Sequence, residues 1–550
     1  MHWLGWFYLA AVLALFTFKI LPYRSAFALH VLGAPLYLAW ALADYGSFLC
    51  ATTASLAFVQ VEPAPFDILV PILLVTGLVG RQLRPRWSAG VALIVVSVAW
   101  GLLSLPWWED IGRGARFLGI TLYLCVTMLV MSWNGGRAAL RAFKNGYLIA
   151  AVAAVGVGFL ALVWQNGHTS HLLYRTPVLV WHPLAYRVQA FFKDPNVFGA
   201  FLVPAILISI DRAVRSSDRG VKGAAGPVCM LLACSLGLLV SYSRGALINA
   251  VCAIAAYTIY LVVRRSRWAA KGLALVALAG VVAVVFVTAA GLWPAVAVRY
   301  RLQPYDRDRI QVQESALASA MRPWTAAPAP SPEAPPGSPP LATDGAGGPP
   351  PAAPESPGQP APEATGRGTT GEGAPSPSGL DTGLVDQLRG SFVSLAWGLS
   401  RDLFLSLQPG SRAIAVVVEA LSRLPVPAVS SWVERFIVGI GPGQFESRFP
   451  RSAHSIYVRF FTEGGACDLG VFLAGLALIA LGSIRAMRAM RWDSMGMLVA
   501  AILLGILAQG ATIDTLHWRH FWVFLGLLPL ASRQTASGQS PLPQPGDRDL

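Results

Sequence analysis

The stretch Ala225–Val263, "AGPVCMLLACSLGLLVSYSRGALINAVCAIAAYTIYLVV", decides the fold class of this 550-residue chain. It is about twice as long as one membrane-spanning helix, which takes roughly 20 residues. The only charged residue in the stretch is Arg244, near the middle. We therefore expect two membrane-spanning helices that are joined by a tight turn at Arg244.

The composition extends this expectation to most of the chain. Hydrophobic residues make up 55% of the sequence and charged residues 13%, whereas soluble domains carry about 25% charged residues. About thirteen apolar stretches approach the length of a span, among them Trp3–Ile20, Trp87–Leu105, Ala115–Met131, Tyr147–Val163, Leu273–Ala290 and Leu469–Ile484. We expect an all-α, polytopic protein of the lipid bilayer with about 12–14 transmembrane helices and one large loop outside the membrane.

The net charge of +14 raises the question of a nucleic-acid partner. The basic residues fall largely in short connections between apolar stretches, which is the pattern of cytoplasmic loops in membrane proteins. We therefore expect no nucleic-acid partner. The six cysteines form neither a Cys-x-x-Cys pair nor a Cys/His metal spacing, so they predict no metal site.

The basic connections also predict a topology, because such loops stay in the cytoplasm. They are Arg81/Arg84/Arg86, Arg137/Arg141/Lys144, Arg212/Arg215/Arg219/Lys222, Arg264/Arg265/Arg267/Lys271 and Arg485/Arg488/Arg491. An even number of spans between neighbouring clusters places the other connections outside: Leu105–Gly114, Asn166–Phe192, Gly291–Ser452 and Gly510–Trp518. For the N-terminus two alternatives stay open. Lys19 and Arg24 favour an outside N-terminus, and one more short span around Phe48–Val59 reverses it.

The sequence divides into five regions. Residues 1–146 are N-terminal transmembrane helices, and 147–290 form a transmembrane core. Residues 291–453 are the large outer loop, in which the Pro-rich part 323–378 is expected to be disordered because it has too little apolar surface to fold. Residues 454–532 are C-terminal transmembrane helices, and 533–550 form a disordered cytoplasmic tail.

With that topology, polar residues from four distant connections face the same side of the membrane. They include Arg187, Asp194, Asn196, Tyr242, Ser243, Arg244, Arg309, His454, Tyr457, Arg459, Glu463, Asp514 and His517. Arginine holds phosphate oxygens through paired hydrogen bonds, and a neutral histidine accepts a proton from an attacking hydroxyl. These residues suggest a lipid-linked diphosphate as leaving group and a sugar hydroxyl as acceptor.

Structural explanations compete with this hypothesis. The simplest interpretation of Asp194 followed by Pro195 is the start of a helix, with Asp194 as the capping carboxylate and Pro195 at the first helical position. Arg244 also fits an interfacial arginine that reaches for water. His454 also fits a structural histidine whose ring nitrogens form hydrogen bonds within the protein.

Three further features have local interpretations. The stretch "GIGPGQF", Gly439–Phe445, lacks the lysine of a phosphate-binding loop and is better explained as a turn. Arg459 and Glu463 are four residues apart and are expected to pair on one helical face, and Gly464 with Gly465 permits a bend. His517 and His520, which neighbour Trp518 and Trp522, favour an interfacial aromatic belt.

Three short stretches resemble a known family. "FFKDPNVFGAFLVP" (Phe191–Pro204), "SYSRGALI" (Ser241–Ile248) and "GIGPGQFESRFPRSAHSIYVRFFTEGG" (Gly439–Gly465) are similar, in order and rough spacing, to elements of the O-antigen ligase and O-antigen polymerase superfamily of the bacterial envelope. The resemblance covers Tyr147 to about Leu530. It departs at Ser455, where the family usually has Asn, and at the Pro-rich insert before the third stretch.

The resemblance implies a C-type glycosyltransferase fold in the bacterial inner membrane, with an active site that faces the periplasm. It implies an inverting transfer that needs no metal, nucleotide or other cofactor. The donor is an undecaprenyl-diphosphate-linked glycan, and the acceptor is a glycan or lipid A-core. His454 resembles the histidine that activates the acceptor, and Arg244 resembles the arginine near the donor diphosphate. Arg187 and Arg309 are candidate companions of Arg244, with supporting residues Asp194, Asn196, Tyr242, Ser243, Tyr457, Arg459 and Glu463.

Two classes of function follow. The first is a polysaccharide polymerase or an O-antigen ligase, and the elaborate outer loop slightly favours the polymerase. The alternative is a transporter or flippase of lipid-linked sugars, which is expected to carry charges near mid-membrane and broken helices. A membrane scaffold leaves the gathering of polar residues on one face unexplained.

Overall fold

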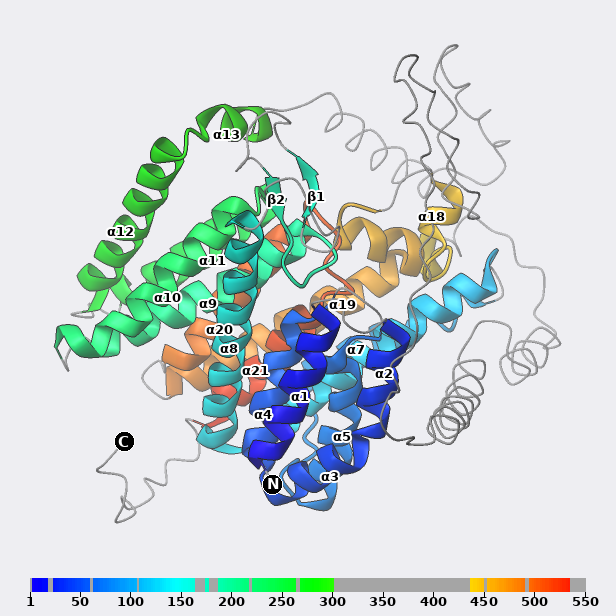
Figure 1. Ribbon diagram of the computed structural model, residues 1–550. Helices are drawn as coiled ribbons and strands as arrows, with labels where there is room; N and C mark the ends of the chain where they lie inside the picture. The colour runs from blue at the N-terminus through cyan, green and yellow to red at the C-terminus, as the bar shows by residue number, and fades with distance from the viewer. Residues whose placement is uncertain are drawn as a thin grey trace, which may run out of the picture. The chain divides into compact units, whose positions relative to one another are not determined.

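The computed structural model describes residues 2–17, 23–59, 63–105, 108–163, 174–177, 186–216, 220–263, 268–300, 436–449, 453–489 and 494–534. The described part is mostly helical (Figure 1). Arg309 and the Pro-rich segment 323–378 lie outside the described residues, so the predictions made for them stay predictions.

The N-terminal half contains α1 (His2–Thr17), α2 (Tyr23–Leu32), α3 (Ala34–Ala43), α4 (Tyr45–Ala54), the 3-10 turn η1 (Ser55–Ala57), α5 (Pro65–Val79), α6 (Ala89–Trp100), α7 (Ile111–Trp133) and α8 (Gly136–Val163). Next come β1 (Tyr174–Pro177), β2 (Tyr186–Val188), α9 (Pro195–Ser216), α10 (Val221–Val240), α11 (Arg244–Val263), α12 (Trp268–Ala289) and α13 (Trp293–Tyr300). The C-terminal part has α18 (Phe445–Arg448), α19 (Ile456–Ala489), α20 (Ser494–Gly510) and α21 (Arg519–Gln534).

Seven of these helices are long and apolar enough to cross a membrane. They span Ile111–Trp133, Gly136–Ala161, Pro195–Ser216, Lys222–Val240, Arg244–Val263, Ala269–Ala289 and Ile456–Arg488. Six shorter apolar helices accompany them. The sequence-based expectation of a helical polytopic membrane protein is confirmed at this level, and the stretch around Arg244 forms the predicted pair of helices, α10 and α11.

Three basic connections meet at one end of the helices. The α5–α6 connection touches the end of α7 through an antiparallel bridge between Leu83 and Asn134. The backbone N–H of Arg84 also donates to Trp133 O at 2.9 Å. Arg212, near the end of α9, donates to Asn145 Oδ1 in α8 at 2.6 Å. We refer to this as the basic end.

Segments next to two of the predicted outer connections meet the two ends of the 58–67 region at the opposite end of the helices. The N–H of Val59 donates to Phe191 O at 3.0 Å, which joins the segment after η1 to the segment before α9. Asp67 at the start of α5 forms an ion pair with Arg519 at the start of α21. Because α5 runs from Asp67 towards the Leu83 bridge, it connects the two ends. We refer to this second end as the polar end.

The packing of α1 to α4 decides between the two orientations of the N-terminus relative to these ends. The hydrogen bonds Gly33 N to Leu29 O and Tyr37 N to Gly33 O keep α2 and α3 in one helical run. That run ends next to α4, whose Tyr45 lies against Gly77 near the basic end. Gly5, at the start of α1, packs against Trp40, near the end of α3. The N-terminal end of α1 therefore lies at the basic end, because α4 supplies the additional helix.

A short hairpin departs from the all-α expectation. β1 and β2 pair antiparallel, with Tyr174 opposite Val188 and Pro177 opposite Tyr186. The strands lie in the connection between α8 and α9, and β2 contacts the ends of α8, α9 and α10. Its aromatic and β-branched residues suit an extended backbone. Apart from this hairpin, the regular structure of the described residues is helical.

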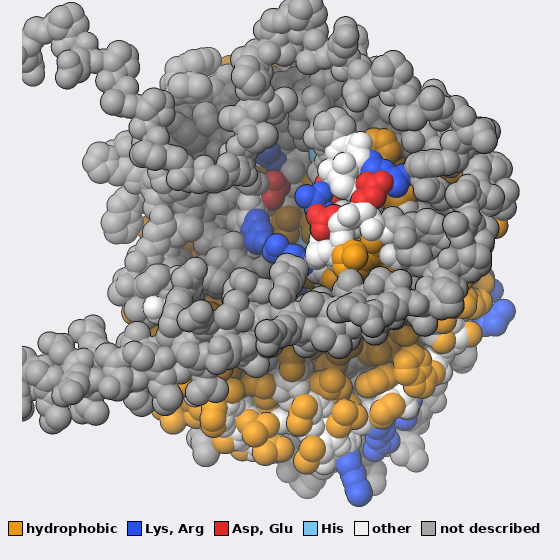
Figure 2. Space-filling view, turned by 90° about the vertical axis from the view of Figure 1, so that its right-hand side faces the viewer, with side chains coloured by type: hydrophobic (Ala, Val, Ile, Leu, Met, Phe, Trp, Pro, Cys, Tyr) orange, Lys and Arg blue, Asp and Glu red, His pale blue; other side chains and the backbone are white. Residues whose placement is uncertain are grey.

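The core is centred on α9, most of whose residues are buried. Tyr147 of α8 stacks on Phe201 of α9, with ring centroids 4.6 Å apart, and its hydroxyl donates to Phe201 O at 2.8 Å. α12 lies at the edge and exposes most of its apolar surface (Figure 1). Figure 2 shows a broad belt of hydrophobic side chains on one face, as expected for a surface in contact with lipid.

Candidate functional site

Arg187 joins two of the predicted motifs. Its Nη2 donates to Asn196 Oδ1 at 2.8 Å, and its Nε donates to Ser241 O at 3.3 Å. Asp194 caps α9, since its Oδ1 accepts from Asn196 N at 2.6 Å and Pro195 occupies the first helical position. The capping interpretation of the DPN motif is therefore correct. The motif also positions Asn196 to accept from Arg187, and Arg187 in turn donates to Ser241 O in the turn between α10 and α11.

That turn has a strained backbone beside Arg244. Tyr242 has φ of +48°, a left-handed conformation that is uncommon for a bulky residue, and its side chain is buried. It packs against Leu292 and Ala295, which flank the start of α13. Ser243 then caps α11, because its Oγ accepts from Ala246 N at 3.2 Å. Arg244 is the first residue of α11 and is half-buried.

The "GIGPGQF" stretch is a turn that docks onto a break in α19. Gly465 has φ of +77° and interrupts the helical hydrogen bonds. Thr462 O and Glu463 O instead accept from Ile440 N at 3.0 Å and Gly441 N at 2.9 Å. A Cβ on Gly439 would lie 2.3 Å from Glu463 O. The glycines are needed because the two backbones touch, and the expected turn and bend are both present.

Arg459 connects this turn to the rest of the polar end. It is 4% exposed and forms ion pairs with Glu446, with Glu463 at 2.9 Å and with Asp514 at 2.7 Å. Its guanidinium also lies 4.9 Å from the centre of the Phe117 ring of α7. The predicted pairing of Arg459 with Glu463 is confirmed. The partners from α18, α7 and the α20–α21 connection show that Arg459 joins four segments.

Glu463 holds the turn in place through its carboxylate. Its Oε2 accepts from Gly443 N at 3.0 Å, and its Oε1 accepts from Phe445 N at 3.1 Å. Gln444, in the same turn, accepts at Oε1 from Glu109 N and Asp110 N at 3.1 and 3.0 Å. The connection before α7 therefore packs on the same turn.

His454 lies immediately before α19, where it is half-buried. The next residue, Ser455, caps the helix because its Oγ accepts from Val458 N at 3.4 Å and its carbonyl accepts from Arg459 N at 3.0 Å. Ser455 therefore stands where the family that this chain resembles usually has asparagine. Serine and asparagine are both favoured at the start of a helix. The cap fixes the backbone beside His454.

One short segment, 507–512, lies next to the residues that neighbour His454 and Arg244. Tyr457, three residues after His454, donates to Leu507 O at 2.9 Å. Ile456 packs against Gly510, and Gly245 packs against Gln509 and Thr512. The starts of α19 and α11 therefore lie on either side of the segment 507–512. Figure 2 shows basic and acidic side chains gathered on one face, above the hydrophobic belt.

The aromatic residues before and within α21 do not form the expected interfacial belt. Trp522 is completely buried and donates to Leu516 O at 2.6 Å. His520 is 3% exposed and lies against Phe201 of the central helix. These side chains face the core of the protein because α21 packs between α7, α19 and α20. The interpretation as a belt is therefore wrong.

Sequence reasoning did not assign Glu446 and Gln444 to the site, and it placed Asp514 on the same face without a partner. No spacing rule connects these three residues to the partners that they bind. A signal for Asp514 is its position between two apolar stretches, and Glu446 follows the glycine turn directly. Arg187 contacts Asn196 and Ser241, and its expected role in anion binding stays a prediction.

The arrangement combines a half-buried arginine at a helix start with a half-buried histidine at another helix start. Helix N-termini favour anions, and an arginine adds paired hydrogen bonds to phosphate oxygens. Among the described residues, no three His, Cys, Asp or Glu side chains are grouped so that they could hold a metal ion. Neither models of known protein families nor curated protein sequences give a match to this chain.

Proposed function

We propose that this chain is a membrane glycosyltransferase similar to O-antigen ligases and polymerases. It transfers a glycan from an undecaprenyl-diphosphate donor to a sugar hydroxyl. The observation that carries the proposal is the shared segment 507–512, against which both Gly245, next to Arg244, and Ile456, close to His454, pack. An anion-binding arginine and a candidate base thus belong to one polar end.

Arg244 is proposed to hold the donor diphosphate at the start of α11. The helix N-terminus and the planar guanidinium both favour phosphate oxygens. Arg187 stays a candidate companion of Arg244 at the diphosphate, and its Nε and Nη2 also donate to Ser241 O and Asn196 Oδ1. It positions the turn that presents Arg244, together with Asp194, Asn196 and the strained Tyr242.

His454 is proposed to act on the acceptor. It takes the proton from a sugar hydroxyl while that oxygen attacks the anomeric carbon of the donor, and the bond from this carbon to the lipid diphosphate breaks. Attack from the face opposite the leaving group inverts the anomeric centre. Arg459, Glu463 and Tyr457 hold the start of α19, and Ser455 caps it.

The proposal includes a location. Basic connections favour the cytoplasm, so the polar end faces the periplasm of a bacterial inner membrane. The seven long apolar helices, the shorter ones and α4 support about 12–14 crossings of the bilayer. The acceptor is a glycan or lipid A-core.

The test is a transfer assay with the full-length protein in detergent or nanodiscs. A defined undecaprenyl-diphosphate glycan is incubated with a glycan acceptor and, in a parallel reaction, with lipid A-core, with EDTA present throughout. We expect a lengthened glycan and free undecaprenyl diphosphate in equal amounts. If neither a glycan acceptor nor lipid A-core yields product, or if transfer strictly needs a divalent cation, this proposal is wrong.

A deletion strain distinguishes the two acceptor classes. Loss of long chains with a single repeat retained indicates a polymerase, which the elaborate outer loop slightly favours. Accumulation of lipid-linked polymer that stays unattached indicates a ligase.

A second candidate, a transporter or flippase of lipid-linked sugars, is favoured by one observation. α19 is broken at Gly465, and Asp468 is buried three residues later. Broken helices with buried charges are common in transporters. Reconstituted vesicles decide this point, since a flippase moves a fluorescent lipid-linked glycan between leaflets without forming a new glycosidic bond.

A further inference from the structure

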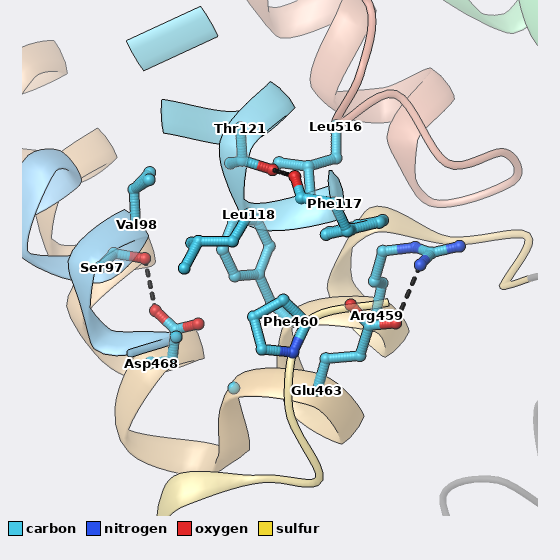
Figure 3. Close-up of a pocket in the computed structure, with 13 residues that line it drawn as sticks. Ser97, Val98, Phe117, Leu118, Thr121, Arg459, Phe460, Glu463, Asp468 and Leu516 are labelled. Atoms are coloured by element: carbon cyan, nitrogen blue, oxygen red, sulfur yellow. Dashed lines mark hydrogen bonds and ion pairs between the residues drawn. The ribbon is translucent and has the colours of Figure 1, made fainter. Parts of the chain in front are cut away.

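A pocket lies at the break in α19, and the proposed transfer reaction does not use it. It is lined by Ser97 and Val98 of α6, Phe117, Leu118 and Thr121 of α7, and Phe460, Gly464 and Asp468 of α19 (Figure 3). Gly101, Pro442, Arg459, Glu463 and Leu516 complete the lining. Most of this lining is apolar, so any charge inside the pocket is poorly solvated.

Asp468 is the unusual member of the lining. It is 5% exposed and belongs to a helix that is long and apolar enough to span the membrane. Its Oδ1 accepts from Ser97 Oγ at 2.5 Å. Among the residues that the structure describes, Asp468 has this one hydrogen bond and no ion pair. The second carboxylate oxygen points away from Ser97 in Figure 3, towards the side of the pocket where Phe460 lies.

The nearest guanidinium does not balance this charge. Arg459 lines the same pocket, but it already forms ion pairs with Glu446, Glu463 and Asp514. Three carboxylates therefore already share this one arginine, and the described residues show no ion pair between it and Asp468. A buried carboxylate without a counter-charge is costly, and such groups in proteins are paired, protonated or bound to a cation.

We propose that the pocket is a binding site for one monovalent alkali cation, with Asp468 Oδ2 as its charged ligand. Ser97 lines the pocket as well, and its hydroxyl donates to Asp468 and retains lone pairs for a cation. The Thr121 hydroxyl is engaged by Phe117 O and His517. One monovalent cation matches the charge of Asp468, the lining carboxylate for which the described residues show no ion pair. The described residues offer no group of three His, Cys, Asp or Glu ligands for a metal ion.

The bound cation has a structural consequence. Asp468 lies against the break in α19, since a Cβ on Gly464 would be 1.9 Å from its Oδ2. The same break receives the 439–445 turn. A cation at Asp468 therefore stabilises the broken helix and the turn that docks on it. This inference does not depend on the proposed glycosyl transfer.

The experiment measures the melting temperature of the full-length protein in detergent. Sodium chloride, potassium chloride and N-methyl-D-glucamine chloride are compared at equal ionic strength and pH 7.5. We expect at least one alkali cation to raise the melting temperature of the wild type by about 2 °C, with saturation, because a ligand stabilises the folded state to which it binds. The Asp468→Asn variant should show no such difference between the three salts.

Two further variants keep the test decisive. Ser97→Ala retains the carboxylate and loses one ligand, so its stabilisation should need a higher cation concentration. Glu109→Gln is the matched control, because Glu109 is half exposed, pairs with Arg448 and does not line the pocket, so it should keep the wild-type response. Equal melting temperatures of the wild type in all three salts would overturn the proposal and leave a proton as the counter-charge. A cation response that survives in Asp468→Asn would overturn it too.

Discussion

At the scale of single residues, Arg459 is the side chain on which the polar end depends most. Its guanidinium is buried, and its three ion pairs come from α18, from α19 and from the connection before α21. Removal of one member of a buried charge cluster leaves the others without a counter-charge, which is far more costly than removal of an exposed pair.

We therefore expect Arg459→Met to lower the free energy of unfolding by about 3–5 kcal/mol. Arg113→Met is the control, since Arg113 is 46% exposed and, among the described residues, pairs with Asp110 alone, so its loss should cost at most about 1 kcal/mol. Denaturation followed by tryptophan fluorescence measures both. Equal losses in the two variants would show that the Arg459 cluster is not a special support.

Arg244 tests the donor side at the same scale. A lysine keeps the charge and cannot reproduce the paired hydrogen bonds of the guanidinium fork. We expect Arg244→Lys to reduce turnover roughly 10- to 100-fold, the effect of losing about 1.5–3 kcal/mol of charged hydrogen bonding. Arg485→Lys, at an exposed position in the last turns of α19, should behave as the wild type. Near-normal turnover in Arg244→Lys would instead favour an interfacial arginine that only reaches for water.

At the scale of elements, the break in α19 and the glycine turn form one unit. The two parts are hydrogen-bonded to each other, since the backbone carbonyls that the break releases accept from the turn. Gly465 is essential for two reasons. Its φ is +77°, and a Cβ there would lie 2.2 Å from Ile437 O.

We expect Gly465→Ala to lower the melting temperature and to abolish transfer, because the turn can no longer dock. Gly470→Ala is the matched control in the same helix, where a Cβ meets nothing within 4 Å. Alanine is the better helix former by about 1 kcal/mol, so this control should be neutral or stabilising. Wild-type behaviour of Gly465→Ala would mean that the helix has no functional break at this position.

The sequence predicted part of this unit. The spacing of Arg459 and Glu463 indicated an ion pair, the glycine pair indicated a bend, and the composition of "GIGPGQF" indicated a turn. The docking of turn on bend could not be predicted, because it depends on backbone groups that become available only when α19 breaks. The contacts of Gln444 with the connection before α7 likewise join residues that no periodicity relates.

At the scale of the whole molecule, the two ends differ in charge and in what they connect. Long apolar stretches and basic connections were sufficient to predict helices and to group the connections. These features did not predict the direction of α1. The short helix α4 has a weak hydropathy signal, and its presence reverses the direction in which all helices before it cross the membrane. Only the packing of Gly5 on Trp40 and of Tyr45 on Gly77 decided it.

We expect the N-terminus to lie on the cytoplasmic side, together with the basic connections. A green fluorescent protein fused to the N-terminus should fluoresce, and an alkaline phosphatase fused after Leu516 should be active, because it reports the opposite side. An active phosphatase at the N-terminus would contradict the arrangement of α1 to α4.

The central claim is that the polar end transfers a glycan with His454 as the base. The most direct measurement is turnover of His454→Ala and His454→Gln with a defined undecaprenyl-diphosphate glycan, at matched protein levels. We expect the alanine variant to lose roughly 10²–10⁴-fold, the usual effect of removing a general base. Glutamine should rescue little, because an amide donates and accepts hydrogen bonds without taking up a proton near neutral pH. Appreciable activity in His454→Gln would reduce the role to orientation of the acceptor, and wild-type turnover in His454→Ala would contradict the claim.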